Sequence, residues 1–105
     1  MVVAYKVTIS PTAKNSLKNI VKYIREFSPQ GAENVRKTIL RKIKSLSKNP
    51  QKYPIESALS EINGEFRFAK EWNYKIIFEI YGNKVDVLVI IHSKKDLPSI
   101  IQEII

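Results

Sequence analysis

Two side chains in the second half of the sequence could carry proton or phosphate chemistry. His92 is the only histidine in the chain, and an imidazole that titrates near neutral pH can act as a general acid or base. Arg67 lies between two phenylalanines, and a guanidinium there could hold a phosphate through two parallel hydrogen bonds. Each has a structural alternative, because His92 could cap a strand end and Arg67 could pair with Glu79, with Asp86 or with a carboxylate of a partner chain. The residue types alone leave these alternatives open.

Composition excludes several other kinds of catalytic site. The chain has no cysteine and one histidine, which excludes disulfides, a thiolate nucleophile, cysteine-based zinc sites and a two-histidine metal site. No nucleotide-binding loop, metal-spaced group of acids or Ser/His/Asp spacing occurs in the sequence. We therefore expect neither a metal nor another cofactor.

The positive charge is concentrated in the first half of the chain. Overall there are 18 Lys and Arg against 10 Asp and Glu, a formal charge of +8. Residues 1–52 contain twelve of the basic residues and only two acidic ones. Most of them form two stepped series, Lys14, Lys18, Lys22 and Arg25 in the first and Lys37, Arg41, Lys44 and Lys48 in the second, with Lys52 following. These series could bind phosphates or an acidic protein, or they could be the solvated faces of two helices.

The first half has the pattern of a strand followed by two helices. Residues 3–9 alternate between apolar and polar side chains, which predicts a half-buried strand. The Ser-Pro pairs at 10–11 and 28–29 are typical helix starts, with serine as N-cap and proline in the first turn. An apolar stripe at spacings of three and four residues follows each pair, and Asn-Pro at 49–50 ends the second. Two amphipathic helices joined so closely should form an antiparallel hairpin.

The second half has the period of three antiparallel strands. Apolar and polar side chains alternate in residues 66–69, 74–81 and 84–92, and the Gly-Asn at 82–83 suits a two-residue hairpin turn. Placing Tyr81 opposite Lys84 predicts the further pairs Phe78–Val87, Ile76–Val89, Tyr74–Ile91 and Glu79–Asp86. One face of the sheet then becomes fully apolar, and we expect the helix hairpin to cover it. Arg67, Lys75 and His92 are predicted on the opposite face.

These elements predict one α+β domain spanning residues 1–105. Its order is an N-terminal strand, an antiparallel helix hairpin and a three-stranded antiparallel meander, with the helices packed on one sheet face. A short amphipathic tail, residues 97–105, has apolar side chains at helical spacing and needs a surface on this chain, on a second copy or on a partner. No apolar run approaches the ~20 residues that span a bilayer, so we expect a cytoplasmic protein with no membrane contact.

The order and spacing of six short segments carry a resemblance to a known family. They are YKVTISPTA at residues 5–13, IVKYI at 20–24, IKSLSKNPQKYP at 43–54, FRF at 66–68, YKIIFEI at 74–80 and VLVIIHSKKDL at 87–97. Together they resemble the RelE/ParE superfamily of toxins from type II toxin–antitoxin systems, over nearly the whole chain.

The resemblance implies one of two targets. RelE-like members cleave mRNA on the ribosome without a metal, and in that case Arg67, His92 and Lys52 would be the catalytic residues. ParE-like members poison DNA gyrase instead. Two features favour the ParE-like group: the segment His92-x-x-x-Asp96-Leu97 and the lack of any tyrosine after Tyr81. A family member without toxic activity is a third alternative.

The resemblance also implies a cognate antitoxin and a role in plasmid stabilization. The antitoxin is expected to be acidic and partly disordered, and operator DNA is bound only through it. Candidate residues for binding nucleic acid or a partner are Lys37, Arg41, Lys44, Lys48, Lys75, Lys94 and Lys95. Candidate contacts to the antitoxin or a second copy are Leu97, Ile100, Ile101 and Ile104.

Overall fold

Two helices and a four-stranded sheet make up residues 4–93, the part of the chain that the computed structural model describes. The order is β1 (Lys6–Ile9), α1 (Pro11–Arg25), α2 (Pro29–Ser45), the short 3-10 turns η1 (Pro50–Lys52) and η2 (Ser57–Leu59), β2 (Glu65–Glu71), β3 (Tyr74–Tyr81) and β4 (Lys84–His92). This order confirms the predicted α+β fold. The tail at 97–105 and the candidates Lys94 and Lys95 lie outside the described residues.

Both helices begin where the sequence predicts. The backbone N–H of Ala13 donates to the hydroxyl of Ser10 at 3.0 Å, and that of Gly31 donates to the hydroxyl of Ser28 at 2.9 Å. Proline follows each capping serine, where its missing N–H leaves no helical hydrogen bond unmade. Phe27, at helical spacing from Ile24, was expected to continue the apolar stripe of α1, but it lies beyond the helix and is 73% exposed.

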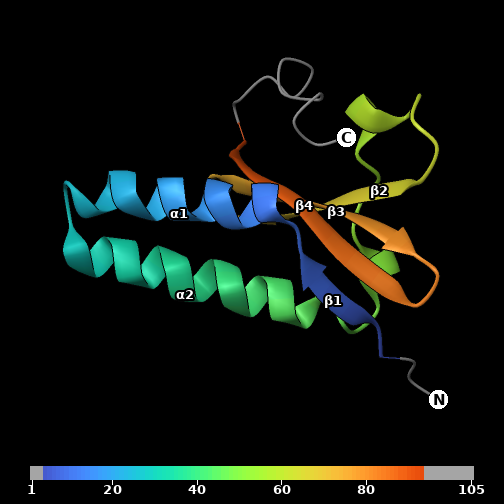
Figure 1. The fold of residues 1–105 in the computed structure, drawn as a ribbon, viewed down its shortest axis with the longest axis horizontal. Helices are drawn as coiled ribbons and strands as arrows, with labels where there is room; N and C mark the ends of the chain where they lie inside the picture. Colours follow the sequence, from blue (N-terminus) through green and yellow to red (C-terminus); the bar gives the residue numbers. More distant parts are fainter. Residues whose placement is uncertain (1–3, 94–105) are drawn as a thin grey trace.

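The sheet is mixed, with strand order β1-β4-β3-β2. β2, β3 and β4 form the predicted antiparallel meander, and β1 joins it in parallel beside β4. Between β1 and β2, which are the two edge strands, the chain passes through the helix hairpin. The hairpin lies on one face of the sheet, and its loop end extends beyond the strands (Figure 1). The core between helices and sheet contains Ala13, Val35, Ile39, Ile43, Leu46, Ala69, Ile76, Phe78, Ile80, Val85, Val87 and Ile90.

A β-bulge in β4 changes the predicted register. The pairs from Tyr81–Lys84 to Phe78–Val87 are confirmed, including Glu79 opposite Asp86, but Ile77 then lies opposite Val89. The extra residue on β4 shifts all later pairs by one, so the predicted pairs Ile76–Val89 and Tyr74–Ile91 are wrong and become Ile76–Ile90 and Tyr74–His92. Because side chains alternate along a strand, the shift also moves each side chain of β4 after the bulge to the sheet face opposite to the predicted one.

Two predicted side-chain orientations are therefore wrong. His92 follows Ile90 onto the helix side of the sheet, opposite Tyr74. Arg67 also lies on the helix side, because it pairs with Phe78, while its two phenylalanine neighbours face the other way. Lys75 does lie on the face away from the helices, as predicted, where its ammonium is 4.1 Å from the centroid of the Phe68 ring.

The face away from the helices has an apolar core of its own. It contains Leu59, Phe66, Ile77, Leu88, Val89 and Ile91, with Ile62 and Phe68 packed against them. Leu59 and Ile62 come from the loop before β2, so this loop covers the second face. Among residues 4–93, neither helix has the length and apolar character that a membrane span requires.

Candidate functional site

A groove between the two helices combines apolar and basic side chains. We call it the hairpin groove, and it has a volume of about 530 Å³. Its lining residues are Ile9, Lys14, Leu17, Lys18, Val21, Lys22, Arg25, Arg36 and Leu40. The first basic series of the sequence therefore lies along this groove.

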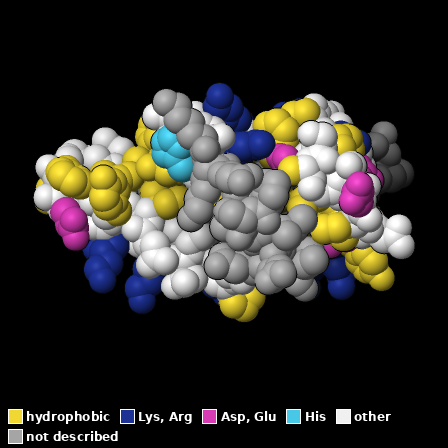
Figure 2. Space-filling model, turned by 90° about the horizontal axis from the view of Figure 1, so that it is seen from above, with side chains coloured by type: hydrophobic (Ala, Val, Ile, Leu, Met, Phe, Trp, Pro, Cys, Tyr) yellow, Lys and Arg dark blue, Asp and Glu magenta, His cyan; other side chains and the backbone are white. Residues whose placement is uncertain are grey.

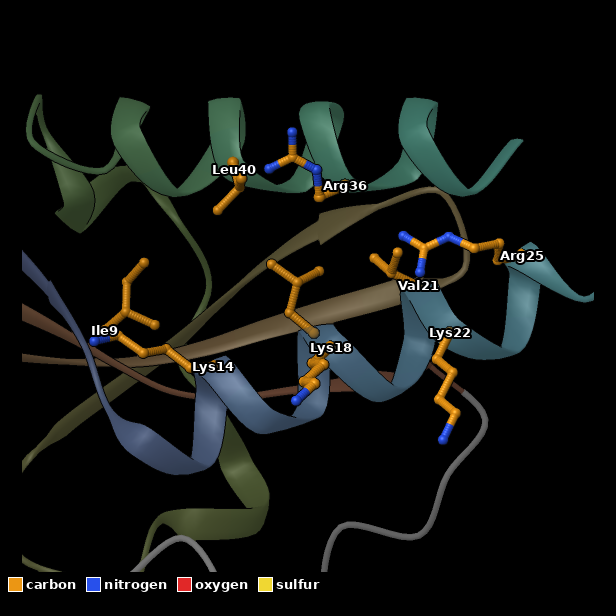
Figure 3. Close-up of a pocket in the computed structure, with 9 residues that line it drawn as sticks. Ile9, Lys14, Lys18, Val21, Lys22, Arg25, Arg36 and Leu40 are labelled. Carbon is orange, nitrogen blue, oxygen red and sulfur yellow. The ribbon is translucent and has the colours of Figure 1, made fainter. Parts of the chain in front are cut away.

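The apolar side chains form the floor of the groove and the cations form its rim. In Figure 3, Val21 points from α1 towards α2, and Leu40 points from α2 towards α1. All five lining cations are exposed, and Lys22 points away from α2 in the same view. No acidic side chain lines the groove within the described part of the chain. Such a surface fits a partner segment with apolar side chains on one side and carboxylates on the other.

One rim cation is partly neutralised within α2. Arg36 donates to Glu33 at 2.9 Å, and this hydrogen bond holds the pKa of the Glu33 carboxyl below its ordinary value. The four cations from α1 have no ion pair to any residue among 4–93. The α1 side of the groove therefore carries the charge that is available to a partner.

A second hollow lies at the C-terminal end of α2. We call it the basic pocket; its volume is about 400 Å³ and its lining is Arg41, Lys44, Ser45, Ser47, Lys48 and Lys52. The structure thus brings together most of the second basic series and the loop candidate Lys52. The remaining candidate of that series, Lys37, is exposed on α2 and lines neither hollow.

Arg67 is held by its own chain. Its Nε donates to Glu65 Oε2 at 2.8 Å, and its Nη1 donates to the carbonyl of Tyr53. The side chain is 18% exposed. These bonds tie the loop before β2 to the sheet, and they use two of the five N–H donors of the guanidinium.

His92 lies at the surface at the end of β4. Its ring makes an edge contact with Tyr74, with the centroids 5.8 Å apart. In Figure 2 the single histidine is exposed beside a group of hydrophobic side chains. Polar residues of α1, among them Asn15 and Asn19, line the adjacent hollow of about 310 Å³. Among the described residues, no lysine or arginine lines this hollow.

The three catalytic candidates do not converge. Arg67 lies opposite Phe78, and His92 lies opposite Tyr74 on the other side of β3. Four residues of strand correspond to about 13 Å, and crossing from β2 to β4 adds about 10 Å. Lys52 is nearer to Arg67, because its ammonium lies 5.2 Å from the ring of Tyr53, whose carbonyl Arg67 binds.

The floor of the hairpin groove was not predicted from the sequence. Leu40 follows Ile39 directly and therefore lies off the core-facing stripe of α2. An apolar residue displaced from the stripe was the available signal for a second apolar surface on the hairpin. The buried pair of Glu56 and Lys75, 2.8 Å apart, was also missed. Within residues 4–93 no three His, Asp or Glu side chains gather in a group that could hold a metal ion.

Comparisons with known proteins agree with this architecture. A family model described as the ParE toxin of type II toxin-antitoxin system, parDE, matches residues 7–97. A chain from a solved structure described as the chromosomal ParDE TA system from P. aeruginosa has the same fold, with a TM-score of 0.69 and 19% sequence identity. That match covers 87% of this chain and 98% of the other. Among curated proteins, none matches the sequence. Because the family model covers most of its length, the chain belongs to the ParE toxin family of type II toxin–antitoxin systems, within the RelE/ParE superfamily.

Proposed function

We propose that this chain is the toxin of a ParDE-type pair, that it acts in the cytoplasm by poisoning DNA gyrase, and that a cognate antitoxin neutralises it by occupying the hairpin groove. The observation that carries the proposal is the groove itself, with its basic rim and apolar floor on a ParE-family fold. Operator DNA is contacted only by the antitoxin in this proposal.

The groove suits an acidic antitoxin segment in two ways. Carboxylates would be attracted to Lys14, Lys18, Lys22 and Arg25, which are exposed and have no ion pair among the described residues. Complementary charge of this kind raises the rate of association and fixes orientation. Apolar side chains of the same segment would bury the half-exposed floor, and this burial would supply most of the affinity.

Gyrase is favoured over mRNA as the target because the candidate ribonuclease residues are dispersed. Metal-independent phosphodiester cleavage needs a proton-transferring group and a phosphate-binding cation around one phosphate. Arg67 is bound to Glu65 and Tyr53, and His92 lies several residues farther along the sheet. The segment at residues 91–97, which resembles the ParE-like group, also favours gyrase.

Expression of the full chain in bacteria, together with a purified gyrase assay, tests the target. We expect filamentous cells with double-strand DNA breaks, and accumulation of cleaved plasmid when the protein is added to gyrase, plasmid DNA and ATP. His92→Ala should retain this activity, because the imidazole has no part in it. Arrest of translation with cleaved transcripts, abolished by His92→Ala, would instead establish the ribonuclease, and normal growth would establish an inactive member.

A charge-reversed groove tests the neutralisation. The cognate antitoxin is sought as a short acidic reading frame beside this gene. The variant Lys18→Glu/Arg25→Glu should remain toxic but bind the antitoxin roughly tenfold more weakly or worse, because two attractions become repulsions. The matched control is Lys70→Glu/Lys84→Glu, two exposed lysines of the sheet, which should be neutralised normally. Equal loss of neutralisation in both variants would place the antitoxin elsewhere.

A further inference from the structure

We propose that the basic pocket at the C-terminal end of α2 binds the sugar–phosphate backbone of duplex DNA. The choice of DNA rests on the proposed gyrase target, since gyrase holds a DNA duplex. The pocket is separate from the hairpin groove, and the two share no lining residue. In this proposal the toxin contacts its target's DNA directly while the antitoxin surface lies elsewhere on the hairpin.

The cations of the pocket differ from their neighbours on α2. Arg36 pairs with Glu33 at 2.9 Å, and Lys42 pairs with Glu71 at 3.7 Å. Arg41, Lys44 and Lys48 have no ion pair to a residue among 4–93. An acidic side chain therefore neutralises Lys42, the sequence neighbour of Arg41, while the positive charge inside the pocket is left for a ligand.

The backbone after α2 brings the last of these cations to the pocket. Asn49 adopts a left-handed conformation with φ of 50°, which asparagine tolerates better than most residues. The chain then turns through η1, and Lys52 at its end lines the same hollow as Arg41. The N–H of Tyr5 donates to the carbonyl of Ser47 at 2.8 Å, which anchors this segment beside β1. The cations therefore extend from a fixed backbone.

Stabilisation of the α2 C-terminus explains only part of this arrangement. Cations interact favourably with the carbonyl end of a helix, but the effect fades beyond the last turn. Lys42 and Lys44 already occupy that turn, whereas Lys48 and Lys52 come after the helix has ended. Gathering four like charges in one hollow raises their mutual repulsion, and a bound anion relieves it.

The lining favours phosphate over an acidic protein segment. Among residues 4–93, the lining consists of cations and the hydroxyls of Ser45 and Ser47, without the apolar floor of the hairpin groove. The same part of the chain offers the pocket no free aromatic face, because the nearby Tyr53 ring packs edge-on against Phe78 and has Lys42 and Lys52 over it. Single strands are bound through stacking of bases on such faces. A paired backbone without base contacts fits this surface best.

Salt-dependent binding of the full chain to a fluorescein-labelled DNA duplex tests the proposal in the absence of gyrase. Four phosphate contacts predict a slope of about −3.6 in log affinity against log salt, or about 150-fold weaker binding between 50 and 200 mM. Arg41→Gln/Lys44→Gln should reduce the slope to about −1.8, or about 12-fold over the same range. Arg41→Lys/Lys44→Arg, which keeps the charges, should restore the original slope.

The matched control is Lys14→Gln/Lys18→Gln, which removes the same charge from the hairpin groove. It should leave the slope unchanged, and circular dichroism should show all variants folded. An equal decrease of the slope in both variants, no binding at 50 mM salt, or tighter binding to duplex RNA or single-stranded DNA of the same length would overturn the proposal. Gyrase poisoning is measured separately, so DNA binding without poisoning would overturn the proposed target and leave this site standing.

Discussion

Charged side chains are arranged differently in the sheet and in the helix hairpin. In and beside the sheet, Lys75 Nζ lies 2.8 Å from the buried carboxylate of Glu56, and Arg67 Nε lies 2.8 Å from the partly exposed carboxylate of Glu65. In the hairpin, Arg36 and Lys42 are ion-paired, while the other basic side chains have no ion pair to residues 4–93 and most of them line two hollows. The sheet therefore uses charge to hold the fold together, whereas the hairpin leaves charge available for partners.

The position of a charged side chain therefore decides whether it contributes mainly to stability or mainly to binding. Substitutions of paired charges at the sheet should lower the free energy of unfolding. Substitutions of unpaired charges on the hairpin should leave stability nearly unchanged and alter binding, because exposed charges contribute little to folding. Substitutions in the two regions can test this division, and the largest effect is expected at Lys75.

Removal of Lys75 should be the most destabilising change. Glu56 is 5% exposed, and its Oε2 has no partner with hydrogen-bond geometry among residues 4–93, so this oxygen depends on the nearby charge of Lys75. Lys75→Ala leaves a buried carboxylate without compensation, which should cost about 3 kcal/mol of unfolding free energy in urea titration. The control Lys44→Ala removes an unpaired hairpin cation and should cost under about 0.5 kcal/mol.

A double substitution shows whether the pair or its packing matters. Glu56→Gln/Lys75→Met removes both charges, so it should be much less destabilising than Lys75→Ala alone. If the single and double variants lose equal stability, the contribution comes from packing of the lysine stem on Phe68. In that case the sheet would not depend on its charge pairs.

Arg67 in the sheet and Arg41 in the hairpin allow the two regions to be compared with the same residue type. Arg67→Ala removes hydrogen bonds to the carboxylate of Glu65 and the carbonyl of Tyr53, and it should cost about 2 kcal/mol. Arg41→Ala should leave the urea midpoint nearly unchanged, because Arg41 is exposed and has no ion pair among residues 4–93. Comparable stability of the two variants would contradict the division between the regions.

The orientation of Arg67 shows where sequence patterns stop being informative. Its position on a strand was predicted, and so were the helix starts, the hairpin and the turn at 82–83. The sheet face predicted for Arg67 was wrong, because Phe66 and Phe68 pack under the covering loop and not under the helices. An alternating pattern predicts that two faces differ, but here both faces bury apolar side chains. Which layer covers which face depends on the path of the loop.

The bulge in β4 and the hollows on the hairpin could not be predicted from the sequence either. Every residue from Val87 to Ile91 is apolar and buried, so the pattern carries no signal for the shift of register. The first basic series lies on α1 as predicted, whereas Lys48 of the second series comes after α2 has ended. That Lys52 joins Arg41 in one pocket depends on the left-handed backbone at Asn49, which composition does not specify.

Ser10 joins the two regions and should give an intermediate effect. Its hydroxyl accepts from the N–H of Ala13 at the start of α1 and donates to the carbonyl of Leu88 in β4 at 2.9 Å. Ser10→Ala should cost about 1 kcal/mol, because a helix cap and a bond to the sheet are lost together. Ser28→Ala is the matched control. Ser28 caps α2 in the same way but is exposed, so the loss in thermal or urea unfolding should be smaller.

Glu79 gives the smallest expected effect and tests the exception in the sheet. Burial, and then the facing carboxylate of Asp86, raise the pKa of the Glu79 carboxyl above its ordinary value of 4.5. The folded protein therefore holds this proton more tightly than the unfolded chain, so the stability from Glu79 is largest at low pH. That stability is lost as the pH rises through the raised pKa.

Glu79→Gln should accordingly raise the urea midpoint at pH 7 and reduce its dependence on pH above 4.5. Asp86→Asn should act on Glu79 in the same direction but gain less, because Asp86 also accepts from the hydroxyl of Thr8 at 3.1 Å. A Gln variant that is less stable at pH 7 would mean that the ionised carboxylate is held by an attraction. The sheet would then stabilise this charge as it does those of Glu56 and Glu65, and the contrast with the hairpin would be stronger than the ion pairs alone indicate.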